Sequence, residues 1–309
     1  MTDATALAGL RLITLADLPA YKAAINQTRR QGWLHYFAFM LLVSQGGVHK
    51  SSRETYWIGD DAGSLCVYML RENSAGSQLN LFLAPMPMQA DVLQRCIERL
   101  RQFNGGARVS IFRLDAAEAG LLRTWPGVRL VSRPDEYLYA PARYQKLSGD
   151  AFADLRHAVN QVRRQGDVQV LPYRCADAPD CRAVHRQWVA DQGGKYPAIN
   201  NLTFTRNCLT MADAFPKSDL SGVVVRVNGE ARAFGFFGEM RADMGNLFIS
   251  YSDHRIAGLH RFLTLQMLAG LQHLALVNSG DAAGAPHLAA AKQGLRPVGM
   301  QPMRQVFFK

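Results

Sequence analysis

The sequence predicts a mixed α/β (α+β) protein made of two successive copies of one architecture, each a mixed sheet flanked by helices. Three observations predict this class. Short apolar strands alternate with amphipathic helices, a hairpin opens each copy, and the order of elements in residues 55–139 returns in residues 222–308. A short sequence also recurs, since Asn-Leu-Phe occurs at both 80–82 and 246–248.

The first copy opens with a hairpin. Its strands are predicted at 55–58 and 65–70, because two apolar runs flank the Gly-containing turn 60–63. A helix is predicted over 90–103, because apolar residues recur there at helical spacing. The remaining predicted elements are strands at 79–84, 108–113, 128–131 and 136–139 and a helix at 116–125.

The second copy begins after an amphipathic helix predicted over 150–165. Its hairpin joins 222–227 to 231–239 through Asn228-Gly229, a turn whose two residues both need positive φ. The elements predicted after it are a strand at 246–251, a helix at 256–274, a strand at 275–278, a helix at 285–293 and a strand at 305–308.

A hairpin followed by strand, helix, strand, helix and strand resembles the Gcn5-related N-acyltransferase fold. The resemblance implies two such domains in tandem, over 1–140 and 141–309. The junction at 84–89 of the first copy contains two prolines, which lack backbone donors, and it has no glycine or cation. We therefore expect no cofactor site in the first domain and an active site in the second.

The composition is globular, with 48% hydrophobic residues, and it excludes disordered and fibrous classes. A net charge of +10 attracts nucleic acid, anionic lipid or a phosphorylated cofactor, or marks only a basic surface. The five scattered cysteines fit neither a disulfide framework nor a zinc site, so no metal is expected. Without a long apolar run or a signal-peptide pattern, the chain is expected to be cytoplasmic.

In such a sheet, ligands bind where parallel strands separate at their carboxyl ends and a helix begins. In the second copy this junction contains Arg255, Gly258 and His260, which we interpret as an anion or cofactor site. The first two match the Arg-x-x-Gly of a coenzyme A cradle, but His260 replaces its final small residue. Asp253 and His254 are candidate catalytic acid–base groups, or only turn residues.

Polar residues also follow the next predicted strand. Asn278 and Asp281 are interpreted either as caps of the following helix or as readers of a substrate ammonium group. Lys292 is either a partner of the helix dipole or a ligand for phosphate or carboxylate. Arg156 lies on the helix predicted over 150–165, where it serves either a solvated face or a phosphate contact.

Two groups of motifs carry a family resemblance that covers nearly the whole chain. The opening group, at 136–139, 147–149, Arg156 and Asn160, reads Tyr-x-Tyr, Leu-x-Gly and a basic helix with Arg and Asn. The closing group comprises Asn278, Gly284, Leu288, Lys292 and Pro297. Together they resemble the bacterial family that includes the C-terminal domain of phosphatidylglycerol lysyltransferase. The chain departs from the closing motif, because 279–280 replaces Arg-Glu and Asp281 is displaced by one place.

The resemblance implies an aminoacyltransferase that moves an amino acid from aminoacyl-tRNA to a lipid or small-molecule acceptor. It implies tRNA as a partner, no further cofactor, and a cytoplasmic chain that can associate with the membrane surface. One alternative is an N-acyltransferase that uses acyl-coenzyme A at 255–260. Another is a non-catalytic binding protein on the same scaffold.

Overall fold

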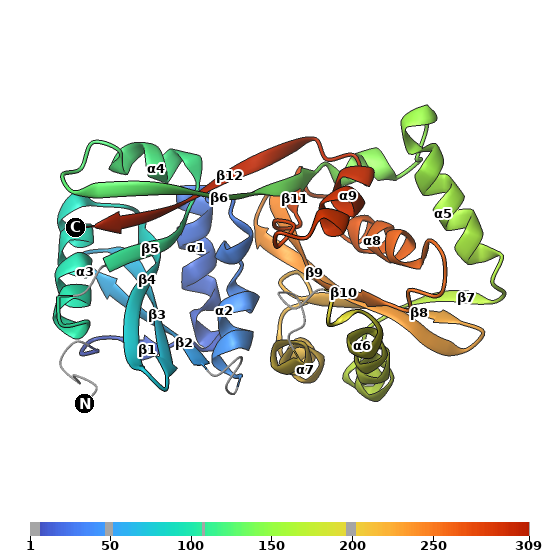
Figure 1. Cartoon of the computed structure of the whole chain (residues 1–309), viewed down its shortest axis with the longest axis horizontal. Coiled ribbons are helices and arrows are strands. Elements are labelled where there is room, and N and C mark those ends of the chain that lie inside the picture. The colour runs from blue at the N-terminus through green and yellow to red at the C-terminus, as the bar shows by residue number, and fades with distance from the viewer. Residues whose placement is uncertain (1–6, 47–51, 107–108, 196–201, 309) are drawn as a thin grey trace. The chain divides into compact units, whose positions relative to one another are not determined.

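The computed structural model describes residues 7–46, 52–106, 109–195 and 202–308 (Figure 1). The chain forms two units. One contains the residues up to Asp135 together with Gln301–Lys309, and the other contains Glu136–Met300. Strand β6 (Val128–Tyr139) begins in the first unit and ends in the second. Strand β12 (Gly299–Phe308) begins in the second unit and ends in the first.

The first unit is built on a mixed sheet with the order β1-β2-β3-β4-β5-β12. The predicted hairpin is present as β2 and β3, which pair in full register from Ser52↔Asn73 to Asp61↔Ser64. Strands β4 and β5 run parallel, and the predicted helix lies between them in sequence. Besides β12, the strands of this sheet are β1 (Arg11–Leu12), β2 (Ser52–Asp61), β3 (Ser64–Asn73), β4 (Gly76–Met86) and β5 (Val109–Leu114).

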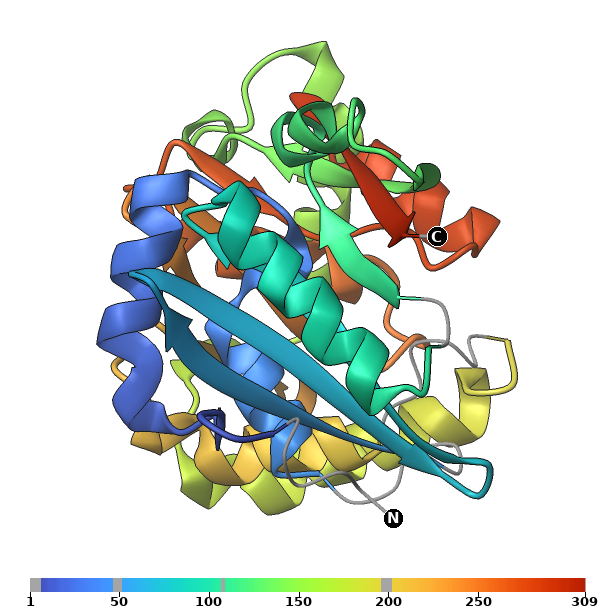
Figure 2. The same cartoon turned by 90° about the vertical axis from the view of Figure 1, so that its left-hand side faces the viewer.

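Helices cover both faces of this first sheet. Helix α3 lies across one face, and α1 and α2 cover the other (Figures 1 and 2). The predicted bounds of α3 are confirmed, and its buried residues are the five apolar ones that recur at helical spacing: Val92, Leu93, Cys96, Ile97 and Leu100. The helices are α1 (Leu18–Thr28), α2 (Phe37–Ser44), α3 (Ala90–Phe103) and α4 (Ala116–Leu122).

The second unit contains the strand order β6-β11-β10-β9-β8-β7. Strands β10 and β11 run parallel, and the other pairs given for this sheet are antiparallel. Its hairpin turns at Asn228 and Gly229, whose φ values of 53° and 82° confirm the predicted turn. Its remaining strands are β7 (Val168–Pro172), β8 (Ser221–Val227), β9 (Glu230–Arg241), β10 (Met244–Ser252) and β11 (Leu276–Asn278).

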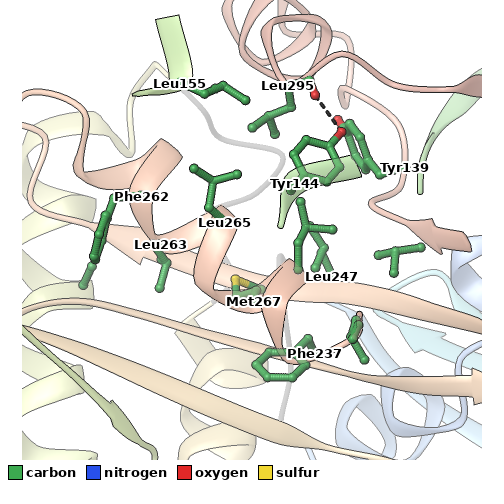
Figure 3. Close-up of a cluster of buried hydrophobic side chains, with 14 of the residues drawn as sticks. Tyr139, Tyr144, Leu155, Phe237, Leu247, Phe262, Leu263, Leu265, Met267 and Leu295 are labelled. Atoms are coloured by element: carbon green, nitrogen blue, oxygen red, sulfur yellow. Dashed lines mark hydrogen bonds between the residues drawn. The ribbon is translucent and has the colours of Figure 1, made fainter. Parts of the chain in front are cut away.

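Helix α8 forms the centre of the core of the second unit. Figure 3 shows its apolar side chains, among them Leu263 and Met267, packed between the sheet residue Phe237 and Leu155 of α5. Helices α6 and α7 cover the opposite face of this sheet (Figure 1). The helices of this unit are α5 (Ala153–Arg163), α6 (Ala178–Gln192), α7 (Leu202–Met211), α8 (Leu259–Ala269) and α9 (Pro286–Gly294).

Four predicted elements differ from the structure in their limits or in their pairing. The helix predicted over 256–274 is shorter, because Gly258 at its start takes a left-handed φ of 81° and Gly270 follows its last turn. The strands predicted at 128–131 and 136–139 form one strand, β6. The last strand, predicted to close the second copy, pairs instead with β5 of the first unit, from Arg304↔Leu114 to Phe308↔Val109.

Candidate functional site

Strands β10 and β11 separate within the second unit. They pair in parallel over only three residues, the last of which is Asn246↔Asn278. Strand β11 ends there, whereas β10 continues to Ser252 before the chain enters α8. The carboxyl ends of these strands therefore open beside the start of a helix, the arrangement in which open α/β sheets bind their ligands.

The junction between β10 and α8 contains Gly258 at the N-cap of the helix. A Cβ atom at this position would lie 2.7 Å from the backbone oxygen of Ala158 on α5. The glycine is therefore required by its left-handed φ and by the close approach of α5. The sequence suggested a different reason, namely the approach of a phosphate to this backbone.

The carboxylate of Asp253, the first acid–base candidate, is held by arginines. It accepts hydrogen bonds from Nε and Nη2 of Arg255 at 2.7 and 2.8 Å, and Nη1 of Arg232 lies 3.3 Å away. It also accepts from the backbone N–H of Arg255 at 3.1 Å. The hydrogen bonds from Arg255 hold the pKa of Asp253 below its usual range. This geometry makes the carboxylate a weak base and an effective brace for the turn.

His254, the second acid–base candidate, lies on the same turn. Its side chain is 41% exposed, and its Nδ1 atom is 3.4 Å from a carboxylate oxygen of Asp191 near the end of α6. Arg255, which braces Asp253, is also largely exposed. Of the predicted residues on this turn, His254 is thus the one whose ring is open to solvent beside a single carboxylate.

Lys292 on α9 and His260 on α8 are two groups with shifted pKa values in this unit. Burial lowers the pKa of Lys292 to about 8, although Asp281 and Glu136 act in the opposite direction. Burial also lowers the pKa of His260, and the charge of Lys292 lowers it further. His260 is exposed to solvent and Lys292 is partly buried, so in both side chains the neighbouring protein removes only part of the surrounding water. Lys292 can therefore hold or release a proton near neutral pH, and His260 favours its neutral form more than a free imidazole does.

The ammonium group of Lys292 is held at the end of β11. It donates hydrogen bonds to the backbone oxygens of Ser279 and, at 3.1 Å, Gly280. It also lies 5.7 Å from the centre of the Tyr137 ring. Tyr139, two residues further on β6, donates to the backbone oxygen of Lys292 at 2.9 Å. These contacts place the charge of Lys292 at the open end of β11. The sequence predicted instead a partner of the helix dipole or a ligand for phosphate or carboxylate.

Asn278 has both ends of its amide engaged inside the protein. Its Nδ2 atom donates to Oε2 of Glu136 at 2.7 Å, and its Oδ1 atom accepts from the N–H of Gly280 at 2.7 Å. The side chain is fully buried. It therefore fixes the turn after β11 and orients Glu136, which differs from the predicted contact with a substrate ammonium group.

Two further predicted residues serve local turns. Asp281 accepts a hydrogen bond from the N–H of Ala283 at 2.7 Å. The Nη1 atom of Arg156 donates to the backbone oxygens of Leu147 and Gly149, at 2.5 and 2.6 Å. Arg156 thus ties α5 to the preceding loop through its Nη1 atom.

Sequence reasoning did not single out Glu136 or the two tyrosines of β6 as site residues. The signal was present, because Tyr137 and Tyr139 alternate along a strand and therefore share one face. Glu136 is a carboxylate that is only 2% exposed. Burying a carboxylate costs free energy of folding even when an amide donates a hydrogen bond to it. We therefore interpret this end of the sheet as a candidate functional site. In the part of the chain that the structure describes, no group of three or more potential ligands could hold a metal ion.

The fold and this open strand end are of the kind that acyltransferases have, and the family of the chain supports a transferase. The chain belongs to the family described as phosphatidylglycerol lysyltransferase, C-terminal, whose model matches residues 26–290. No curated protein matches the chain. None of the helices in the described ranges is both long and apolar enough to cross a membrane.

Solved structures share the fold at low sequence identity. A protein of unknown function from Bacteroides thetaiotaomicron is 17% identical, with a TM-score of 0.79, and 97% of this chain and 99% of that chain are covered. The C-terminal domain of a protein described as a lysylphosphatidylglycerol synthetase from Agrobacterium fabrum is 14% identical, with a TM-score of 0.66 and coverage of 95% and 92%. L-PGS from Bacillus licheniformis is 15% identical, with a TM-score of 0.63 and coverage of 94% and 91%. These likenesses confirm the predicted fold class.

Proposed function

We propose that the protein is an aminoacyltransferase that moves an amino acid from aminoacyl-tRNA to a lipid or small-molecule acceptor. The observation that carries this proposal is the open end of β10 and β11, where Lys292 and His260 have lowered pKa values, in a chain of the lysyltransferase family. The net charge of +10 favours a polyanionic donor.

The chemistry follows from the charges at this strand end. An acceptor hydroxyl or amine attacks the ester carbonyl of the donor, and negative charge develops on the carbonyl oxygen. The ammonium group of Lys292 and the first backbone amides of α8 stabilise that charge. The lowered pKa of His260 favours its neutral form, which can accept the proton of the acceptor. Glu136 and Asp281 supply the negative charge that favours binding of the amino acid's ammonium group.

The main alternative is acyl-coenzyme A as the donor. A pyrophosphate cradle needs small residues so that phosphate can approach the backbone at the start of α8. The close approach of the Ala158 backbone already explains the glycine at 258, and the sequence has His260 where the cradle has its final small residue. Both observations favour aminoacyl-tRNA. If coenzyme A is used instead, His260→Gly should strengthen its binding.

The first experiment is a binding titration of the purified protein at low and raised salt. The ligands are charged total tRNA, uncharged tRNA and acetyl-coenzyme A. We expect binding that prefers charged tRNA and weakens steeply with salt, because several phosphates are contacted. Tight binding of acetyl-coenzyme A without preference for charged tRNA would overturn the proposal.

A transfer assay identifies the class of acceptor. Total tRNA charged with labelled amino acids is incubated with the protein and either phosphatidylglycerol vesicles or an aqueous small-molecule extract. Transfer is read as label that becomes alkali-stable or moves into the organic phase. Lys292→Met should reduce transfer by about 100-fold or more, whereas the exposed Lys146→Met should leave it unchanged. Equal rates in both variants would exclude Lys292 from the reaction.

A further inference from the structure

Two cysteines of the first unit lie side by side in its core. Cys66 lies on β3 and Cys96 on α3, and both are at most 2% exposed. Their sulfur atoms are 3.7 Å apart. Both belong to the same cluster of apolar side chains, which packs α3 against the sheet. The proposed function uses neither residue.

The surroundings of the two sulfur atoms are unequal. The hydroxyl group of Tyr68 donates a hydrogen bond to the sulfur of Cys96 at 3.0 Å. The guanidinium group of Arg99, one turn further along α3, lies 5.7 Å from the centre of the Tyr68 ring. The hydrogen bond with Cys66 lowers the pKa of Cys96, whereas the same bond raises the pKa of Cys66. Cys96 is therefore the better thiolate, and thiolates are the species that oxidants attack.

The geometry points to a reversible disulfide between Cys66 and Cys96, formed when the protein meets a hydroperoxide. A disulfide has a sulfur–sulfur distance of about 2.05 Å, so the two sulfur atoms must approach by about 1.7 Å. The bond would join α3 covalently to β3. It would add a redox-sensitive link to the first unit, independent of the transferase reaction.

The reaction balances with one hydroperoxide. The Cys96 thiolate attacks the peroxide oxygen, which breaks the O–O bond and gives a sulfenic acid. The sulfur of Cys66 then attacks the sulfur of Cys96, and the hydroxyl group leaves as water. Two thiols lose two protons and two electrons. Hydrogen peroxide takes up the two protons and the two electrons and becomes two molecules of water.

The remaining cysteines lie in the second unit and have other surroundings. Cys175 is partly exposed, and its thiol faces the backbone oxygens of Leu209 and Thr210, at 3.8 and 3.7 Å. Removing it keeps the oxidation of a partly exposed thiol out of the measurement. Cys175→Ser is therefore the background for the experiment. Cys208 is buried as deeply as the pair and serves as the matched control.

The experiment treats the full-length Cys175→Ser protein with hydrogen peroxide and then measures its intact mass. We expect a loss of about 2 Da that dithiothreitol reverses, and a peptide map in which the segments containing Cys66 and Cys96 are cross-linked. Cys66→Ser and Cys96→Ser should each abolish the mass loss, whereas Cys208→Ser should retain it. The oxidised protein should also have a higher Tm than the reduced protein, because the bond closes a long loop.

Either of two results would overturn the inference. One is oxidation that only adds oxygen to the protein, with no cross-linked peptide. The other is a mass loss that survives in Cys66→Ser. The peptide map of the protein with both cysteines present decides the matter even if a serine variant fails to fold.

Discussion

Lys292 shows how one side chain can link the stability of the protein to its candidate chemistry. Burial lowers its pKa from the ordinary value of 10.5 to about 8. Between these two values the unfolded chain binds more protons than the folded protein, so stability must rise with pH there. Below pH 8 both states are protonated, and the folded state carries the full cost of the buried charge.

Lys292→Met should remove this pH dependence. We expect the free energy of unfolding to rise by about 1–3 kcal/mol between pH 8 and pH 10 relative to the variant. The measurement is urea unfolding of both proteins across this range, so that other titrating groups cancel in the difference. The exposed Lys146→Met is the control and should follow the unaltered protein. A constant difference between Lys292→Met and the unaltered protein would contradict the buried-charge argument.

Gly258 provides a second test at the scale of the residue. Alanine at this position combines a left-handed φ of 81° with a Cβ atom 2.7 Å from the backbone oxygen of Ala158. Gly284 has a similar φ of 72° but open space around it. We expect Gly284→Ala to cost about 1 kcal/mol and Gly258→Ala about 2–4 kcal/mol. Equal losses in urea unfolding would mean that the close approach of α5 is not what requires glycine.

The contacts of individual side chains were harder to predict from the sequence than the helices and strands. The spacing of Arg156 on an amphipathic helix was compatible with a phosphate contact, but two backbone oxygens of its own loop satisfy it. Asn278 was compatible with substrate recognition, but Glu136 and Gly280 engage it. In both cases the partner lies far off in sequence or on the backbone of a turn, and periodicity reports neither.

The first unit is tied together by a buried ion pair between elements that are distant in sequence. Arg30, just after α1, lies 2.7 Å from a carboxylate oxygen of Glu118 on α4, and both are nearly inaccessible to solvent. The Nη2 atom of Arg30 also donates to the backbone oxygens of Ala84 and Pro85, near the carboxyl end of β4. Burial raises the pKa of Glu118 to about 7, against the charge of Arg30.

Arg30→Met should destabilise the first unit by about 3–5 kcal/mol, because it leaves a buried carboxylate and two backbone oxygens without their donor. Glu118→Gln in the Arg30→Met background should recover part of this loss. The exposed Arg53→Met should change stability by less than about 0.5 kcal/mol. Urea unfolding measures all four proteins. A loss no greater than that of Arg53→Met would show that the pair does not stabilise the unit.

Elements were predicted best where local rules dominate. The hairpin at Asn228-Gly229 followed from two residues that tolerate positive φ, and α3 followed from the spacing of its apolar residues. The end of α8 was misjudged, because apolar residues continue past Gly270 although the helix stops. Helix α2 was not predicted, since its apolar residues surround it and give no periodic signal.

At the scale of the whole molecule, the fold class was predictable from the repeated order of elements, but the path of the last strand was not. Strand β12 completes the sheet of the first unit, where Val306 and Phe308 enter the apolar cluster around α3. Buried and less buried residues alternate along most of it, as in many strands, and nothing local says which β-strand it will join. Long-range pairing of this kind is decided by the assembled sheet.

Deleting residues 301–309 should therefore weaken the first unit and spare the second. We expect the amides of β5 to lose their protection from hydrogen exchange, because their partner strand is gone, while those of β10 keep theirs. Exchange measured by mass spectrometry on peptides from both strands checks this in one sample. Loss of protection in β10 rather than β5 would contradict the assignment of the last strand to the first unit.

Because the last strand joins the sheet of the first unit, it also fixes the order in which the two units can be completed during synthesis on the ribosome. The first unit emerges first, yet its sheet lacks a strand until Gln301–Phe308 have been made. The whole of the second unit, Glu136–Met300, is translated in that interval. The half of the protein that is made earliest must wait with an open edge on β5, and it is the last to be finished.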